Sequence, residues 1–203
     1  MQRLGIFGGT FNPPHKGHIY IACEAMKAAA LDKMLFIPCG NPPHKKVAGD
    51  VAAKHRFQMT RLAIEGSPNF EITDLEIKDK SPSYTAKTLE KLKVLCPDSK
   101  LCFVVGGDSL RDMEGWYHPE KICSLAEIIA VSRGGIEDAV LAEKAEFYRK
   151  KYNAQITVIT VSPLDISSSD IRQKIAGGED VSDAVEDSVL KYIKENGIYK
   201  DSI

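Results

Sequence analysis

The chain has 203 residues, of which 43% are hydrophobic and 27% are charged, and its formal net charge at pH 7 is -1. This length suits one sizeable domain, and the composition is that of a globular protein rather than a disordered or fibrous one. The nearly neutral charge argues against a nucleic-acid-binding protein, which usually carries a strong basic excess. We therefore expect small anionic partners, no nucleic acid and no membrane.

The five cysteines are odd in number and form no CxxC pair. A disulfide framework and a structural zinc site are therefore not expected, and most of these thiols should be small core residues. The N-terminus lacks a charged segment followed by a long apolar run, and no stretch approaches the roughly 20 apolar residues of a membrane span. These features predict a soluble, cytoplasmic protein.

Short apolar runs alternate along the chain with segments of helical spacing. In chain order we expect a strand at 4–7, a helix at 17–30, a strand at 34–38, a loop at 41–49, a helix at 55–64 and a strand at 70–77. There follow a helix capped by Ser83, strands at 101–105 and 128–131, a helix at 139–152, a strand at 156–161, a helix at 168–176 capped by Ser167, and a helix at 185–196 ended by Gly197.

This alternation predicts an α/β fold with a doubly wound parallel sheet and helices on both faces. In such sheets ligands bind beyond the carboxyl ends of the strands. The loops that follow the expected strands should therefore lie near one another. No repeat or composition break divides the chain, so residues 1–203 are predicted to form a single domain.

The loop after the first expected strand, GGTFNPPHKGH at residues 8–18, has the composition of a phosphate-binding segment. Gly8 and Gly9 allow backbone N–H groups to approach an anion closely. His15 and His18 share one face at the start of the next helix, whose N-terminus also favours negative charge. A single histidine there would more often be a surface residue, but the pair indicates phosphate chemistry. The spacing is neither that of a Walker A loop nor GxGxxG.

A second segment, ISSSDIR at residues 166–172, can act on the same anion. Serine hydroxyls at a helix start can cap the helix or donate to a phosphate, and Arg172 can reach the same group as a planar fork. Taken alone, the segment is equally well explained as a helix cap followed by an incidental arginine.

His15-Lys16-Gly17-His18 resembles the HxGH signature of the nucleotidyltransferase superfamily, and ISSSDIR resembles its ISSTxxR signature, with Ser169 in place of the usual threonine. Nearly from end to end the chain is similar to the bacterial nicotinate-nucleotide adenylyltransferase family. This similarity is carried by GGTFNPPHKGH, IPCGNPPHKK, SYTAKTLEKL, FVVGGDSL with Trp116-Tyr117, VSRGG, ISSSDIR and VLKYIKENGIY. The resemblance implies a Rossmann-like nucleotidyltransferase fold. It also implies transfer of AMP from ATP to nicotinate mononucleotide, which yields deamido-NAD and pyrophosphate in NAD biosynthesis.

The resemblance further implies roles for individual residues. Three catalytic residues would stabilise charge on the triphosphate, namely His15, His18 and Arg172. The ATP-binding residues would be Gly8, Gly9, Thr10, Phe11, Gly106, Asp108, Ile166, Ser167 and Ser168. The residues that bind nicotinate mononucleotide would be Lys45, Thr85, Trp116, Tyr117 and Arg133. The C-terminal helical part, roughly residues 166–203, would complete the ATP site.

Mg²⁺ is expected to bind mainly through the ATP phosphates, because the sequence shows no dedicated carboxylate cage. Two alternatives stay open: another nucleotidyltransferase of the superfamily, with nicotinamide mononucleotide or phosphopantetheine as acceptor, and a non-catalytic nucleotide-binding module. Asp108 could instead cap a helix, and Trp116 could be a core aromatic residue. The oligomeric state stays open as well, and a homo-oligomer would be compatible with the sequence.

Overall fold

The computed structural model describes residues 1–43 and 47–200. Within these ranges all the strands are parallel and form one sheet of order β3-β2-β1-β4-β5-β6. The strands are β1 (Gln2–Gly9), β2 (Lys33–Pro38), β3 (Phe70–Ile72), β4 (Ser99–Gly106), β5 (Glu127–Ser132) and β6 (Ile156–Thr160). The prediction of a doubly wound parallel sheet is confirmed.

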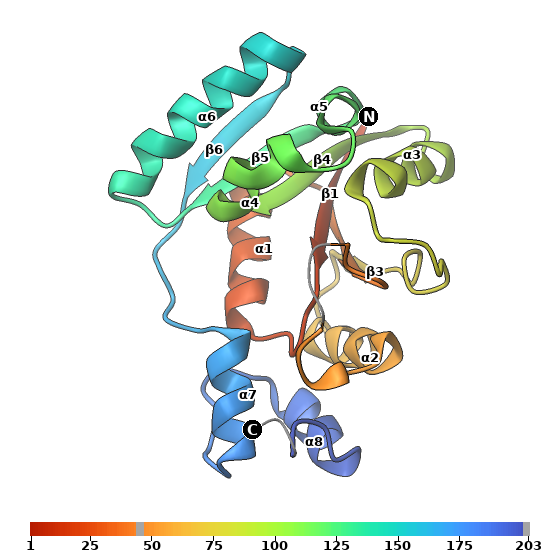
Figure 1. Cartoon of the computed structure of the whole chain (residues 1–203), viewed down its shortest axis with the longest axis vertical. Helices are drawn as coiled ribbons and strands as arrows, with labels where there is room; N and C mark the ends of the chain where they lie inside the picture. The colour runs from red at the N-terminus through yellow and green to blue at the C-terminus, as the bar shows by residue number, and fades with distance from the viewer. Residues whose placement is uncertain (44–46, 201–203) are drawn as a thin grey trace.

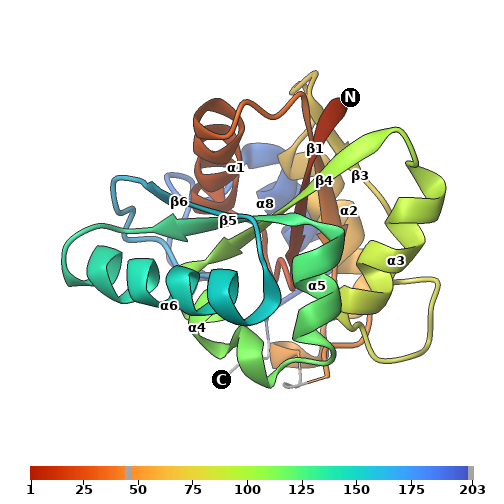
Figure 2. The same ribbon diagram turned by 90° about the horizontal axis from the view of Figure 1, so that it is seen from above.

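The helices of the described chain are α1 (Lys16–Ala28), α2 (Ala53–Ala63), α3 (Thr85–Leu95), α4 (Gly107–Asp112), α5 (Pro119–Leu125), α6 (Ile136–Tyr152), α7 (Ser168–Ala176) and α8 (Asp187–Glu195), with 3-10 turns at Ala48–Asp50 and Met113–Gly115. α1 covers one face of the sheet and α3 to α6 cover the other (Figure 2). α7 and α8 lie at one end of the molecule beside α2 (Figure 1). Across residues 1–43 and 47–200, no helix has both the length and the apolar character that crossing a membrane requires.

The central strands are continuous apolar runs because both faces of the sheet are covered. In β4, Leu101, Phe103 and Val105 point into the core beneath α3 to α6. Cys102 and Val104, which alternate with them, point into the core beneath α1. β5 divides its side chains between the two cores in the same way. Every apolar residue of such a strand is therefore buried on one face or the other.

Most expected elements are present, with ends displaced by a few residues. The predicted signals at both C-terminal helices are confirmed. Ser167 Oγ accepts the N–H of Asp170 at 3.1 Å and so caps α7. Gly197 follows α8 with a φ of 62°, the left-handed conformation in which glycine commonly ends a helix.

Two predictions are wrong, and contact with the loop after β2 explains both. β3 spans only Phe70–Ile72 instead of residues 70–77. The chain leaves the sheet edge there and passes over Gly40, where a Cβ would lie 2.1 Å from the carbonyl oxygen of Glu76. Ser83 does not cap α3, because its Oγ accepts the N–H of Asn41 at 3.1 Å and the N-cap residue is Tyr84.

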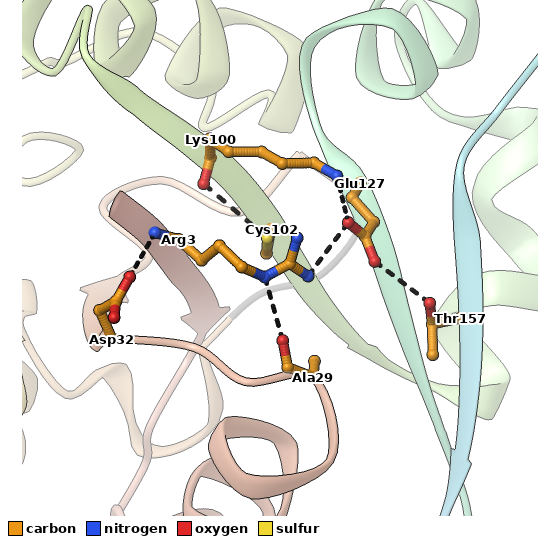
Figure 3. A network of polar contacts seen from close by, with 7 residues as sticks. All are labelled: Arg3, Ala29, Asp32, Lys100, Cys102, Glu127 and Thr157. Atoms are coloured by element: carbon orange, nitrogen blue, oxygen red, sulfur yellow. Dashed lines mark hydrogen bonds and ion pairs between the residues drawn. The ribbon is translucent and has the colours of Figure 1, made fainter. Parts of the chain in front are cut away.

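Glu127, at the start of β5, connects four strands at the amino edge of the sheet (Figure 3). Its carboxylate accepts hydrogen bonds from Arg3 of β1 at 3.1 Å, Lys100 of β4 at 2.7 Å and Thr157 of β6 at 3.1 Å. Burial opposes ionisation of this carboxyl, but the hydrogen bond from Lys100 and the charges of Arg3 and Lys100 outweigh it and hold the pKa of Glu127 below its ordinary value. Ion pairs therefore join the strands at this edge, and the loops that follow the strands lie at the opposite edge.

We expect Glu127→Gln to lower the free energy of unfolding by about 1–3 kcal/mol, because the amide leaves two partly buried cations without their counter-charge. The control is Glu71→Gln, which breaks an exposed ion pair with Lys33 between β2 and β3 and should cost less than about 1 kcal/mol. Urea denaturation at pH 7 measures both variants. Equal costs would contradict a bridging role for Glu127.

Candidate active site

Two cavities lie at the carboxyl edge of the sheet. The first, of about 240 Å³, is called the aromatic cavity here, and its lining includes Gly8, Gly9, Thr10, Glu76, Tyr84, Thr85, Trp116 and Tyr117. The second, of about 340 Å³, is called the histidine cavity, and its lining includes His15, Gly17, His18, Gly106, Asp108, Arg133, Ile166, Ser167 and Ser168. The segment that runs from the end of β1 to the start of α1 lines the aromatic cavity with Gly8, Gly9 and Thr10 and the histidine cavity with His15, Gly17 and His18.

Side chains of α7 hold this loop by its backbone carbonyl groups. Arg172 Nη1 donates to the carbonyl oxygen of Asn12 at 2.8 Å. Ser168 Oγ donates to the carbonyl oxygen of Pro13 at 2.9 Å. The ISSSDIR segment therefore contacts the loop just before the HxGH segment, across about 155 residues of sequence.

Arg56 of α2 also binds a backbone carbonyl group of this loop. It is 1% exposed, and its guanidinium donates to the carbonyl oxygens of Thr10 at 2.8 Å, Val51 at 3.3 Å and Gly40 at 3.4 Å. These carbonyls belong to the loops that follow β1 and β2 and to the entry into α2. One buried cation thus joins three segments at the carboxyl edge of the sheet.

His15 and His18 pack against each other, with ring centroids 3.8 Å apart. The backbone N–H of His15 donates to Nδ1 of His18 at 3.2 Å, so a neutral His18 carries its proton on Nε2. The ring of His15 folds over Gly17, where a Cβ would lie 3.0 Å from His15 Nδ1. Glycine between the two histidines therefore provides the room in which the rings meet.

Burial sets the charge state of this pair. It lowers the pKa of His15 to about 4. Burial, followed by the charge of His15, also lowers the pKa of His18 well below its ordinary value of 6.5. Both imidazoles are therefore neutral at pH 7. Among the buried side-chain polar atoms of the described residues, His15 Nδ1 has no hydrogen-bond partner, which is costly unless a ligand or water satisfies it.

The rest of the histidine cavity is built from the starts of two helices. Ser167 is the N-cap residue of α7, and its Oγ also donates to Asp170 Oδ2 at 2.7 Å. Gly106 is the N-cap residue of α4, so Asp108 does not cap that helix and instead pairs with Arg111 in its first turns. Helix N-termini carry partial positive charge, and both therefore suit an anionic ligand.

Trp116 combines the two roles considered for it. Its ring lies against Phe103 with centroids 6.4 Å apart and packs on the core, and it also lines the aromatic cavity. Tyr117 stacks on Tyr84, which also lines the cavity, with ring centroids 4.4 Å apart. Thr85 begins α3, whose N-terminus carries no side-chain cap. The cavity thus offers aromatic faces beside an uncapped helix end.

The expected site residues divide between the two cavities differently from the grouping that the resemblance implied. Gly8, Gly9 and Thr10, expected beside ATP, line the aromatic cavity. Arg133, expected beside Trp116, lines the histidine cavity because β5 ends on that side. The structure therefore groups Arg133 with His15 and His18.

Phe11 and Lys45 need separate comment. Phe11 is 2% exposed and lines neither cavity, and its ring packs against Phe7, Phe36 and the imidazole of His18. A Cβ on Gly9 would lie 2.9 Å from the Phe11 ring, which explains the glycine. Lys45 lies outside the described residues.

Sequence reasoning missed Arg56, Asn12 and Tyr199, all of which are buried around the loop. An arginine within a helical pattern is normally a surface residue, and nothing local marks Arg56 as buried. Asn12 lies inside the segment GGTFNPPHKGH, but its residue type there indicates no particular role.

Over the described ranges, no group of three or more His, Cys, Asp or Glu side chains is arranged to hold a metal ion.

The cytidylyltransferase-like family matches residues 6–174 of the chain. A Clostridium botulinum protein named "Probable nicotinate-nucleotide adenylyltransferase" is 43% identical over 201 residues, which cover 99% of this chain and 100% of the relative. A protein of the same name from Carboxydothermus hydrogenoformans is 41% identical over 98% of each chain. The solved structure of Plasmodium falciparum nicotinic acid mononucleotide adenylyltransferase, complexed with NaAD, shares the fold with a TM-score of 0.79 at 21% identity over 98% of each chain. The chain therefore belongs to the nicotinate-nucleotide adenylyltransferases within the cytidylyltransferase-like family.

Proposed function

We infer that this protein transfers AMP from ATP to nicotinate mononucleotide, giving deamido-NAD and pyrophosphate in NAD biosynthesis. The observation that carries the inference is the segment of residues 8–18, from the end of β1 to the start of α1, which lines the aromatic cavity with Gly8, Gly9 and Thr10 and the histidine cavity with His15 and His18. Two phosphate-bearing substrates can therefore meet across one loop, which is the arrangement that a group transfer between them requires.

The aromatic cavity suits the pyridine nucleotide. Trp116 offers a face on which a pyridine ring can stack. The uncapped N-terminus of α3 at Thr85 carries partial positive charge, which favours a nicotinate carboxylate over an uncharged amide. Lys45 would meet the phosphate of this substrate. Phosphopantetheine, a flexible and largely aliphatic acceptor, gains less from such walls.

The histidine cavity suits ATP. Its helix starts at Gly106 and Ser167 and the cation of Arg133 surround the imidazole pair. Each neutral imidazole already has one N–H to donate, and the negative charge of a bound triphosphate would raise the pKa of both, so that either can also take up a proton. The residues of a phosphate-transfer site are thus intact, which argues against a non-catalytic nucleotide-binding module.

In the proposed reaction a phosphate oxygen of nicotinate mononucleotide attacks the α-phosphorus of ATP in line. A new P–O bond forms as the bond from the α-phosphorus to the bridging oxygen breaks, and pyrophosphate leaves with that electron pair. The attacking phosphate is already an anion, so no general base is needed. Catalysis consists of positioning two polyanions and neutralising charge that builds in the transition state, which is the role we assign to His15, His18 and Arg172.

Mg²⁺ would supply further neutralisation of the triphosphate charge. The described residues offer Asp108 as a single carboxylate in the histidine cavity, so we propose that the ligands of Mg²⁺ are mainly phosphate oxygens and water.

We also propose that the reaction takes place in the cytoplasm, because all five cysteines are free thiols, as is usual in a reducing compartment.

The function is tested by measuring pyrophosphate release from ATP with nicotinate mononucleotide, nicotinamide mononucleotide and phosphopantetheine in parallel. We expect turnover with the first and much less with the other two. Turnover only with phosphopantetheine would show that the acceptor has been misassigned.

The neutral state of His15 predicts a pH-dependent stability. Below pH 6.5 the unfolded imidazole binds a proton that the folded one does not bind until about pH 4, so stability falls as the pH falls through this window. Wild type should lose up to about 1.4 kcal/mol per pH unit relative to His15→Gln. Urea denaturation at pH 7, 6 and 5 measures this, with exposed His118→Gln as the control; parallel losses in wild type and His15→Gln would refute it.

His18→Ala is expected to lower kcat on the order of 10²–10³-fold, because it removes a preorganised donor from the triphosphate. The KM for ATP should change much less. His55→Ala, which removes a histidine bonded to Tyr192 between α2 and α8, is the control for loss of a partly buried ring. Steady-state kinetics decide the matter, and a near wild-type kcat would exclude the role assigned to His18.

Trp116→Ala should raise the KM for nicotinate mononucleotide about 10-fold, equivalent to about 1.4 kcal/mol of lost stacking, and leave the KM for ATP nearly unchanged. Trp116→Phe keeps an aromatic face and should retain most of the affinity. If Trp116→Ala raises both KM values equally, the ring acts only through the core.

A further inference from the structure

The C-terminal segment after α8 returns to the active-site loop. Tyr199 Oη donates to Asn12 Oδ1 at 2.7 Å, a contact between residues 187 positions apart. Both residues are buried, with 4% of each exposed. Tyr199 has a φ of 69°, a conformation that a bulky residue adopts only when its surroundings hold it there.

The side-chain oxygen, the side-chain nitrogen and the backbone carbonyl oxygen of Asn12 each form a hydrogen bond. Its Oδ1 faces Tyr199, while its Nδ2 donates to the carbonyl oxygen of Ala48 at 2.8 Å. Its own carbonyl accepts from Arg172 at 2.8 Å. Asn12 is therefore the point of the loop at which the C-terminus, α7 and the turn before α2 all meet, and it lies three residues before His15.

The ring and the hydroxyl of Tyr199 have separable roles. The ring belongs to a core formed by α2, α7 and α8, in which it packs with residues such as Met59, Ile171 and Val189. The hydroxyl is the part that leaves this core and reaches the active-site loop. Removing the hydroxyl alone should therefore preserve the packing and release the loop.

We propose that Tyr199 is a positioning residue for the transfer reaction, because its hydroxyl holds Asn12 and thereby keeps His15 and His18 aligned for the triphosphate. This inference rests on the proposed function. It assigns the last described turn of the chain to the same site as the HxGH segment at its beginning.

The test compares Tyr199→Phe with Tyr148→Phe. Tyr148 is the matched control, since it is 0% exposed and its hydroxyl donates to the carbonyl oxygen of Leu110 at 3.0 Å within a different core, the one beneath α3 to α6. We expect both variants to lose similar stability in thermal unfolding. Only Tyr199→Phe should lower kcat, by about 10–100-fold, with the KM for nicotinate mononucleotide nearly unchanged.

A second measurement does not depend on catalysis. The imidazole signals of His15 are followed by NMR in the free protein as the pH is lowered from 8. In Tyr199→Phe and in Asn12→Ala, which breaks the same bond from the loop side, water should reach the ring and move its titration midpoint up by roughly one unit. Tyr148→Phe should titrate like wild type.

The outcomes separate the two claims. A wild-type protein that releases no pyrophosphate with nicotinate mononucleotide contradicts the proposed function, and the His15 titration still tests the role of Tyr199. A wild-type kcat together with an unchanged His15 titration in Tyr199→Phe overturns the inference. If Tyr199→Phe fails to fold, a wild-type titration and kcat in Asn12→Ala overturn it equally.

Discussion

The carbonyl groups of the loop between β1 and α1 accept hydrogen bonds from side chains that come from much later in the chain, and both cavities depend on these bonds. Arg56 holds Thr10, and Arg172 holds Asn12. A loop at the end of a parallel strand has no ladder partner of its own, so without such donors its carbonyls would turn to water. Because they are held, the loop keeps the histidine pair at the start of α1 beside one cavity and the glycines at the end of β1 beside the other.

Buried charges are compensated differently at the two edges of the sheet. At the amino edge, Glu127 is surrounded by cations that neutralise it. At the carboxyl edge, Arg56 is buried against carbonyl groups and forms no ion pair among the described residues, and His15 and His18 are neutral. Burial lowers the pKa of Arg56, and the three carbonyl acceptors together with the charge of Glu76 offset part of the cost of burying it.

The fold followed from local pattern to a large extent. The alternation of apolar runs with segments of helical spacing predicted the strands and a parallel sheet with helices on both faces, because such a sheet requires those patterns. The pattern failed at residues 73–77 and at Ser83, where contact with the loop after β2 overrode it. Likewise, Arg133 belongs to the histidine cavity rather than to the cavity of Trp116, and only the way β5 ends decides this.

The sequence by itself determined what is local: the two glycines at the end of β1, the spacing of His15, Gly17 and His18 on one turn, and the serine cap of α7. Each depends on backbone geometry within a few residues. The tertiary structure alone decided that Arg56 and Tyr199 converge on the loop and that the imidazoles lose their charge. Burial and solvation depend on which distant segments pack around a side chain. The local sequence therefore does not distinguish a buried arginine or tyrosine from an exposed one.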